Sequence, residues 1–172
     1  MAKPRYTFYW DLIGDVDARE NLGPLVRVEV YRLMQLCFRE VLEKHYGTEQ
    51  ADDLFRDGGR LAGEHFYKRF LADPGSPDLS SFVTKMQTKL RDLGIGIVRV
   101  EKANLEQGTL VLTVDEDLDC SGLPDLDHEF CAYDEGFFEG VLSSYMQRKF
   151  RVREVDCWCT GARTCRFMAE IV

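Results

Sequence analysis

The sequence predicts an α+β domain in which an antiparallel sheet of two hairpins is covered by about four helices. Two observations support this prediction. Across most of residues 24–94, apolar residues recur at steps of three and four, which is typical of amphipathic helices. After Gly94 the period changes to two, and two pairs of alternating stretches, each joined around a glycine, flank one further helical segment.

The first helix is expected to begin near Pro24 and to end at Gly47, since proline suits a first helical turn and glycine a helix end. Its apolar residues lie on one stripe and polar residues fill the opposite side, so the stripe is expected to face the core. Cys37 belongs to this stripe and is interpreted as a small core residue. The stripe consists of Val30, Leu33, Met34, Cys37 and Val41, opposite Arg32, Gln35, Arg39 and Glu43.

A second helix is predicted from Glu49 to about Phe70, although Gly58, Gly59 and Gly63 interrupt it. Each glycine inside a helix costs about 1 kcal/mol relative to alanine. The run therefore indicates a kink, or the close approach of another backbone or a ligand, and a break into two shorter helices fits equally well. A loop over residues 73–78 and a third helix from Leu79 to Gly94 complete this part.

The two hairpins follow. Residues 95–100 and 110–114 are predicted to pair around the turn Glu106-Gln107-Gly108, and an acidic loop then covers residues 115–129. A fourth helix is expected from Cys131 to Arg148. The last hairpin joins residues 150–158 to residues 165–172 through a turn at Gly161.

Length and composition are those of one folded domain, with 172 residues, 45% hydrophobic and 30% charged. We assign residues 24–172 to that domain. Residues 1–23 carry aromatics without a clear period and are interpreted as an N-terminal arm packed onto something else, a dimer contact being one use for it. The aromatics are Tyr6, Phe8, Tyr9 and Trp10.

Charge and hydropathy limit the partners. The net charge of −8 argues against direct binding to nucleic acid or to an anionic membrane. Apolar runs fall well short of the roughly 18–20 residues that span a bilayer, and no apolar stretch follows the first residues. We therefore expect a cytoplasmic protein without membrane or targeting segments.

Five of the six cysteines fall in the last third of the chain, where a reducing compartment favours metal binding over disulfides. Four thiolates suit a closed tetrahedral zinc site without bound water. The best set occupies the ends of predicted elements, so one structural zinc ion would tie the fourth helix to both hairpins. This set is Cys120, Cys131, Cys157 and Cys165.

Alternatives remain at this site. Cys159 lies two residues from Cys157, on the same face if the strand continues, and is a substitute ligand. A carboxylate beside Cys120 is another, or the thiols are reduced and carry no metal. The sequence contains no CxxC pair of the thioredoxin type. The acidic candidates are Asp115, Glu116, Asp117 and Asp119.

Aromatic and aliphatic side chains on the second and fourth helices indicate an apolar pocket for a small hydrophobic ligand, and the glycines of both helices are expected to leave room for it. Packing of the same side chains into an ordinary core is the alternative. Two aromatics beside the cysteines are expected to line the metal side of the pocket. The predicted ligand-binding residues are Phe66, Phe70, Tyr133, Phe137, Phe138, Val141, Tyr145 and Trp158.

Features of an enzyme are few. Gly94-Ile95-Gly96 lacks the third glycine of a dinucleotide fingerprint, and no GxSxG or Ser-His-acid set is present. A zinc ion held by four cysteines has no open position for water. Glu154 is expected on an inward strand face, where a salt bridge to an arginine is favoured over a role as acid or base.

The sequence resembles the 4-vinyl reductase (4VR) domain family, the predicted hydrocarbon-binding proteins. The densest stretches are residues 131–140, 152–157 and 161–167, which hold Cys131, Cys157 and Cys165 with glycines and Glu154 at fixed offsets. Weaker similarity extends upstream to Arg19-Glu20-Asn21-Leu22-Gly23, so the resemblance covers nearly all of the chain after its first fifteen residues.

The resemblance implies helices over an antiparallel sheet, as in vesicle-tethering subunits and haem-based nitric oxide sensors, and a homodimer. Relatives include the sensory domains of activators that respond to phenols and toluenes, where a zinc site lies beside the effector pocket. Three of their cysteine ligands match Cys131, Cys157 and Cys165, and their fourth ligand is a glutamate where this chain offers Cys120. The tryptophan that holds the phenol corresponds to Asp119 here, which argues against phenol itself.

Two functions follow from these observations. The first is a non-enzymatic zinc-containing sensor domain for a small hydrophobic ligand, acting through a separate output protein because the chain has no DNA-binding segment. The second is a reductase or accessory subunit that acts on a tetrapyrrole-type substrate, as the family name implies. A bound flavin, haem or nicotinamide would favour the second.

Overall fold

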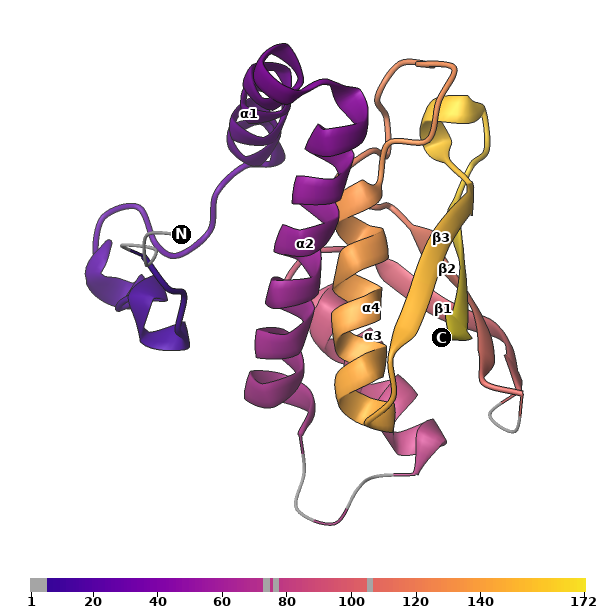
Figure 1. Ribbon diagram of the computed structural model, residues 1–172. Coiled ribbons are helices and arrows are strands. Elements are labelled where there is room, and N and C mark those ends of the chain that lie inside the picture. Colours follow the sequence, from indigo (N-terminus) through magenta and orange to yellow (C-terminus); the bar gives the residue numbers. More distant parts are fainter. Residues whose placement is uncertain (1–5, 73–74, 76–77, 105–106) are drawn as a thin grey trace.

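The α+β prediction is confirmed by a computed structural model that describes residues 6–72, 75, 78–104 and 107–172 (Figure 1). Most of the predicted loop at 73–78 and Glu106 of the predicted turn lie outside these residues. The helices are α1 (Val28–Tyr46), α2 (Thr48–Phe66), continued by a π-helical turn (Tyr67–Leu71), α3 (Leu79–Asp92) and α4 (Ala132–Met146). The strands are β1 (Ile97–Asn104), β2 (Thr109–Asp115), β3 (Phe150–Asp156) and β4 (Cys165–Ile171).

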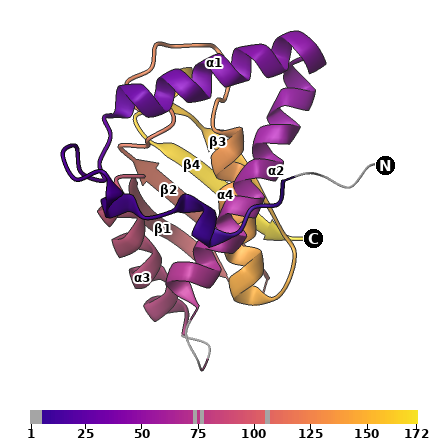
Figure 2. The same cartoon turned by 90° about the vertical axis from the view of Figure 1, so that its left-hand side faces the viewer.

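The strands form one antiparallel sheet in the order β1-β2-β4-β3, in which β2 and β4 join the two predicted hairpins. Leu112 lies opposite Val100 in β1 and Phe167 in β4. Leu112 and Phe167 are fully buried because the helices cover that face of the sheet (Figure 2). None of the helices in the described part of the chain has the length and apolarity needed to cross a membrane.

Helix α4 packs against both α2 and β3 and is buried along most of its length (Figure 1). Its apolar side chains meet the sheet and α3 in a single core. Phe138 contacts Phe167 of β4, with ring centroids 5.4 Å apart, and Tyr145 stacks on Phe82 of α3 at 3.9 Å. The last strands of the sheet are thus held through α4.

Glycines set the distance between α2 and α4. A Cβ atom on Gly63 would lie 2.1 Å from the carbonyl oxygen of Phe137, and one on Gly140 would lie 2.2 Å from that of Arg60. Gly59 and Gly136 show the same reciprocal contact. The two helices therefore touch along their backbones, and α2 continues unbroken. The expectation that these glycines leave room for a ligand was wrong, because the opposite backbone fills the space.

Two glutamates of α4 join this helix pair to the edge strand β3. Glu135 accepts a hydrogen bond from the backbone N–H of Glu154 at 2.8 Å, and Glu139 accepts one from Val152 at 3.1 Å. Each glutamate also pairs with an arginine of α2, Arg56 and Arg60 respectively. Amides of an edge strand that would face water or another chain are thereby satisfied internally.

Helix α1 packs with its polar side inward, contrary to the prediction. Gln35 and Arg39 are buried, whereas Cys37 is exposed, so its assignment to the core was wrong. The apolar stripe faces outward as well, and Leu33 and Met34 are each 67% exposed. The physical reason is that the polar side has dedicated partners: Arg32, for example, donates to the carbonyl oxygens of Leu118 and Ser121 at 2.9 and 2.8 Å.

Candidate metal centre

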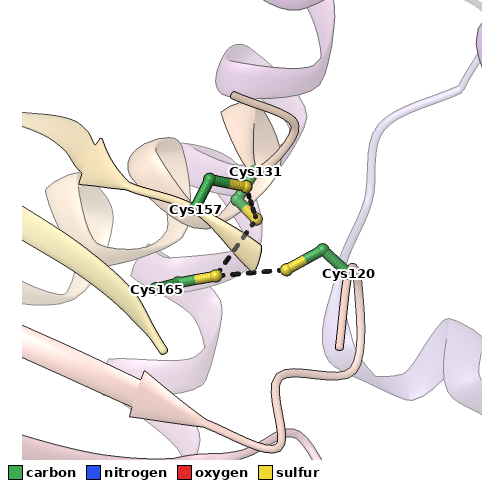
Figure 3. Close-up of side chains that lie close together, drawn as sticks. All are labelled: Cys120, Cys131, Cys157 and Cys165. Atoms are coloured by element: carbon green, nitrogen blue, oxygen red, sulfur yellow. Dashed lines mark hydrogen bonds between the residues drawn. The ribbon is translucent and has the colours of Figure 1, made fainter. Parts of the chain in front are cut away.

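The four cysteines of the predicted set come together at one end of the sheet, although 45 residues separate the first from the last (Figure 3). Cys120 lies in the loop after β2, and Cys131 immediately precedes α4. Cys157 follows β3, and Cys165 begins β4. Each sulfur is thus placed by the end of a different element, as the sequence predicted.

The sulfur positions fit a tetrahedral ion. All four lie within 4.8 Å of one another, with separations of 3.8 Å from Cys131 to Cys165 and 4.0 Å from Cys131 to Cys157. Zinc–sulfur bonds of about 2.3 Å place the sulfurs of a tetrahedral site about 3.8 Å apart. The Cys120–Cys165 pair is closer, at 3.1 Å. All four side chains are at most 1% exposed, so they would enclose an ion without bulk water.

The cluster favours a thiolate even without a metal. Hydrogen bonds from the thiols of Cys120, Cys131 and Cys165 lower the pKa of Cys157 well below its usual range. The hydrogen bond with Cys120 is the leading cause of a raised pKa at Cys131. Three thiols thus stabilise one thiolate, which is a suitable first ligand for a soft or borderline metal ion.

Cys159, the alternative fifth ligand, lies outside this group of four sulfurs. The strand ends at Asp156, and residues 158–160 form a 3-10 turn, so Cys157 and Cys159 do not share a strand face. Burial raises the pKa of the Cys159 thiol to about 12.

The carboxylates near Cys120 divide into two kinds. Glu116 is exposed, and Asp115 pairs with Arg99. Asp117 and Asp119, in contrast, are buried, at 3% exposure each. Asp117 accepts hydrogen bonds from the backbone N–H groups of Asp119 and Cys120, at 2.7 and 3.3 Å, and so shapes the loop that presents Cys120.

Two further buried acids adjoin the cysteines, and sequence reasoning did not group them with the site. Asp134 lies in the first turn of α4, three residues after Cys131. Glu154 accepts a hydrogen bond from the backbone N–H of Cys131 at 3.1 Å, and its other carboxylate oxygen has no partner in the described chain, so the expected salt bridge to an arginine was wrong. Burial raises the pKa of Asp134 and Glu154, the latter to about 10, and that of Asp117 to about 7.

Helix α1 is bound to the same loop. The Tyr31 hydroxyl donates to Asp119 at 2.7 Å, and burial raises the pKa of Tyr31. The Arg39 guanidinium lies over the rings of Phe55 and Phe130, 4.8 and 4.9 Å from their centroids, and pairs with Asp52. The position of α1 therefore depends on the loop that carries Cys120.

The predicted ligand-binding residues are packed together in two groups. Phe66, Phe137, Phe138 and Val141 are buried in the core, and Phe66 meets Phe137 with ring centroids 5.2 Å apart. The other four are half-buried at the edge of the core: Phe70, Tyr133, Tyr145 and Trp158.

A small apolar cavity of about 10 Å³ adjoins Tyr145, between the end of α4 and the first hairpin. Leu79, Leu110, Leu142 and Phe150 line it. This volume equals about one water-sized probe. An aromatic molecule would have to displace side chains here.

Sequence comparison decides the family. Residues 110–171 match the vinyl-4-reductase (4VR) domain, and this stretch contains all four cysteines of the cluster. The chain contains a 4VR domain. An uncharacterized protein of Methanocaldococcus jannaschii, MJ1642, is 25% identical over 153 residues, which cover 89% of this chain and 83% of the relative.

Solved structures show that the 4VR domain and the helices before it form one known fold. A vinyl-4-reductase family protein of Methanocaldococcus jannaschii has a TM-score of 0.66 at 12% identity and covers 98% of this chain and 99% of its own. The phenol-responsive sensory domain of the transcription activator PoxR, solved with phenol, scores 0.63 at 17% identity, with 86% and 75% covered.

The two wider likenesses expected for the fold are also found. Subunit 3 of the trafficking protein particle complex of Naegleria fowleri has a TM-score of 0.64 at 11% identity, covering 84% of this chain and 95% of its own. An H-NOX protein of T. tengcongensis scores 0.52 at 15% identity, covering 94% and 87%. At these identities the likenesses show the fold alone.

Proposed function

We propose that this 4VR-domain protein is a non-enzymatic sensor domain that contains a structural zinc ion and binds a small hydrophobic molecule. The observation that carries the proposal is the convergence of four buried cysteine sulfurs within 4.8 Å. Such a donor set suits zinc, since four thiolates satisfy the ion completely. Cys120, Cys131, Cys157 and Cys165 would hold it, and it would fasten α4 to both hairpins.

The sensor role is supported by the 4VR match and by the phenol-responsive domain that shares the fold. The aromatic group on α2 and α4 is the predicted binding region, with Phe66 in ring contact with both Phe70 and Phe137. Because these rings are closely packed, binding requires them to move apart, beginning at the half-buried Phe70 or at the cavity beside Tyr145. A ligand that opens this region would also shift α4 relative to α3.

A homodimer is the second part of the proposal, and the outward apolar stripe of α1 is its surface. Val30, Leu33, Met34 and Val41 are between 49% and 67% exposed, and no part of the described chain covers them. The N-terminal arm lies near α2, where Trp10 meets Phe70 at 5.0 Å, and it carries further exposed apolar residues such as Leu22. A second copy packing on α1 and the arm would bury both groups.

The oligomeric state tests this surface. We expect Leu33→Glu to convert a dimer into a monomer in sedimentation equilibrium, while Met168→Glu, at an exposed apolar position on the sheet, leaves the dimer intact. Cys37 lies on the same stripe, so a short bis-maleimide should crosslink two chains through it. A wild-type monomer at high concentration would contradict the homodimer.

A separate output protein completes the proposed sensor, because the charge of −8 disfavours a direct contact between this domain and nucleic acid. The six cysteines are all free thiols, which fits the reducing cytoplasm. We propose that occupancy alters α1 and the dimer, and that the output protein reads this change.

The identity of molecules that co-purify with the protein tests the sensor against the reductase. Mass spectrometry of an organic extract is expected to find a small apolar molecule in a protein without flavin or haem absorbance. Phe70→Ala should lower its occupancy, whereas Tyr46→Ala, at an exposed position on α1, should not. A tightly bound redox cofactor, or turnover with a reduced nicotinamide, would instead establish the tetrapyrrole reductase or its accessory subunit.

A further inference from the structure

A second group of metal-ligating atoms lies beside the four cysteines. Asp117, Cys131 and Asp134 each present one ligand atom, and these atoms lie within 4.8 Å of one another. All three side chains are buried, at 3%, 1% and 8% exposure. Cys131 belongs to both groups, so its sulfur stands between the cysteine cluster and the two carboxylates.

The carboxylates beside the cysteines lack the partners that buried acids require. Oδ2 of Asp134 is buried without a hydrogen-bond partner in the described chain, and the same holds for Oδ2 of Asp119 and Oε1 of Glu154. An unpaired buried polar atom costs about 1–3 kcal/mol, and more when it is charged. Asp134 is therefore a strong ligand atom that protein groups in the described chain do not use.

Charge gives an independent reason for a cation here. One zinc ion on four thiolates leaves two negative charges uncompensated, and four acids are buried next to it: Asp117, Asp119, Asp134 and Glu154. The nearby arginines are engaged elsewhere, since Arg39 pairs with Glu43 and Asp52, and Arg32 donates to backbone carbonyls. Buried charge of one sign is stable only when it is neutralised or paired.

We propose that Asp117, Asp134 and the sulfur of Cys131 hold a second divalent cation, with Cys131 bridging it to the zinc of the four-cysteine site. This proposal rests on the proposed zinc function. Two carboxylate oxygens and one thiolate form a mixed set that zinc accepts well, at about 2.0–2.3 Å. A bridging thiolate donates a separate lone pair to each of two ions, so each zinc has a sulfur ligand.

The second ion would differ chemically from the first. Its three protein ligands leave a fourth position for water or for an oxygen atom of a bound molecule, which the four-cysteine site does not offer. It would also reach the α1 contact, because Asp117 shapes the loop whose Asp119 accepts from Tyr31. Occupancy of the second site would thus be felt at the base of α1.

The test counts metal ions in the full chain. Reduced protein saturated with zinc and freed of excess metal is examined by native mass spectrometry and elemental analysis. We expect two zinc ions per chain in the wild type and one in Asp134→Asn, with the variant folded by circular dichroism because the four cysteines remain. Asp125→Asn is the control, since Asp125 is an exposed acid in the same loop as Asp117, and it should keep two.

A cobalt titration of the wild-type protein gives a readout without any substitution. A bridging thiolate couples the spins of two Co²⁺ ions, so the electron paramagnetic resonance signal should rise to one equivalent and fall between one and two. A single zinc per chain at saturation, with a cobalt signal that stops at one equivalent, would overturn the second site and leave the first intact. It would mean that the acids are neutralised by protons. No bound metal at all would contradict both proposals.

Discussion

Two regions fasten α4 to the rest of the molecule, and they do so by opposite means. At the glycine crossing, the backbones of α2 and α4 are in direct contact, and Gly63 and Gly140 permit it. At the cysteine end, four sulfurs and four carboxylates are buried together, with few cationic partners among the described residues. The crossing is complete as it stands, whereas the cysteine end requires an ion.

The difference teaches where stability comes from in each region. Close helix packing gains dispersion contacts that need no cofactor, and the Arg60–Glu139 pair satisfies the polar groups around it. Burial of thiolates and carboxylates is unfavourable until a cation compensates them. Substitutions in the two regions should therefore differ in their response to metal, even where both destabilise the fold.

The largest effect is expected from Cys165→Ser. A structural zinc site supplies roughly 10 kcal/mol or more of apparent free energy, while a whole domain is stable by about 5–15 kcal/mol. The variant should lose its zinc and unfold or aggregate, and Cys131→Ser should do the same, as judged by circular dichroism and metal content.

Cys37→Ser is the matched control, because Cys37 is exposed and lies on α1, outside the group of four sulfurs. It should keep both the zinc and the melting temperature of the wild type. Equal losses for Cys37→Ser and Cys165→Ser would remove the distinction between the cysteine end and the rest of the chain.

A smaller but still large effect is expected at the glycine crossing. A Cβ at residue 140 would lie 2.2 Å from the carbonyl oxygen of Arg60, so Gly140→Ala must push the helices apart. We expect a loss of roughly 3 kcal/mol in the free energy of unfolding, measured by urea denaturation. Unlike the cysteine variants, this one should still bind zinc.

Gly58→Ala tests the same argument with the opposite sign. Gly58 is on α2 and has open space where a Cβ would be, so alanine should stabilise the helix by about 0.5–1 kcal/mol. If both alanine variants were equally tolerated, the backbone contact between α2 and α4 would be refuted.

The smallest destabilisation is expected where α1 meets the cysteine end. Tyr31→Phe removes the hydroxyl that donates to the buried Asp119 and should cost about 1–3 kcal/mol. Hydrogen exchange should accelerate in α1 and change little in α4. Tyr46→Phe, at an exposed tyrosine of the same helix, should have no such effect, and identical exchange in both variants would uncouple α1 from the metal loop.

Much of the fold is predictable from the sequence because local patterns determine it. The change of period after Gly94 predicts the two hairpins, and the cysteines at element ends predict their meeting. The pairing of β2 with β4 joins the hairpins into one sheet. It depends on long-range register that no local pattern specifies.

Two predictions failed for reasons of tertiary context. The apolar stripe on α1 does form one face, but an apolar face turns inward only when the rest of the protein has no better partner for the opposite side. Here the carbonyl oxygens of residues 117–121 and the carboxylate of Asp119 bind the polar side. Likewise, glycines on two helices indicate either a space or a contact, and only the reciprocal positions of Gly63 and Gly140 decide for contact.

The acidic part of the site is only partly accessible to sequence reasoning. Asp117 and Asp119 are evident as neighbours of Cys120, but Asp134 belongs to a helix that is buried on several sides, so no polar stripe or apolar stripe locates it. Its spacing of three residues from Cys131 places both side chains near one helix end, and that signal was available. Its burial becomes apparent only in the folded chain.

The central claim is that the cysteine end holds a zinc ion through its four sulfurs. X-ray absorption at the zinc edge of freshly purified, reduced protein tests this most directly. The account predicts a first shell dominated by sulfur at about 2.3 Å, which Cys165→Ser abolishes. A protein with no zinc, or a zinc shell of nitrogen and oxygen without sulfur, would contradict it.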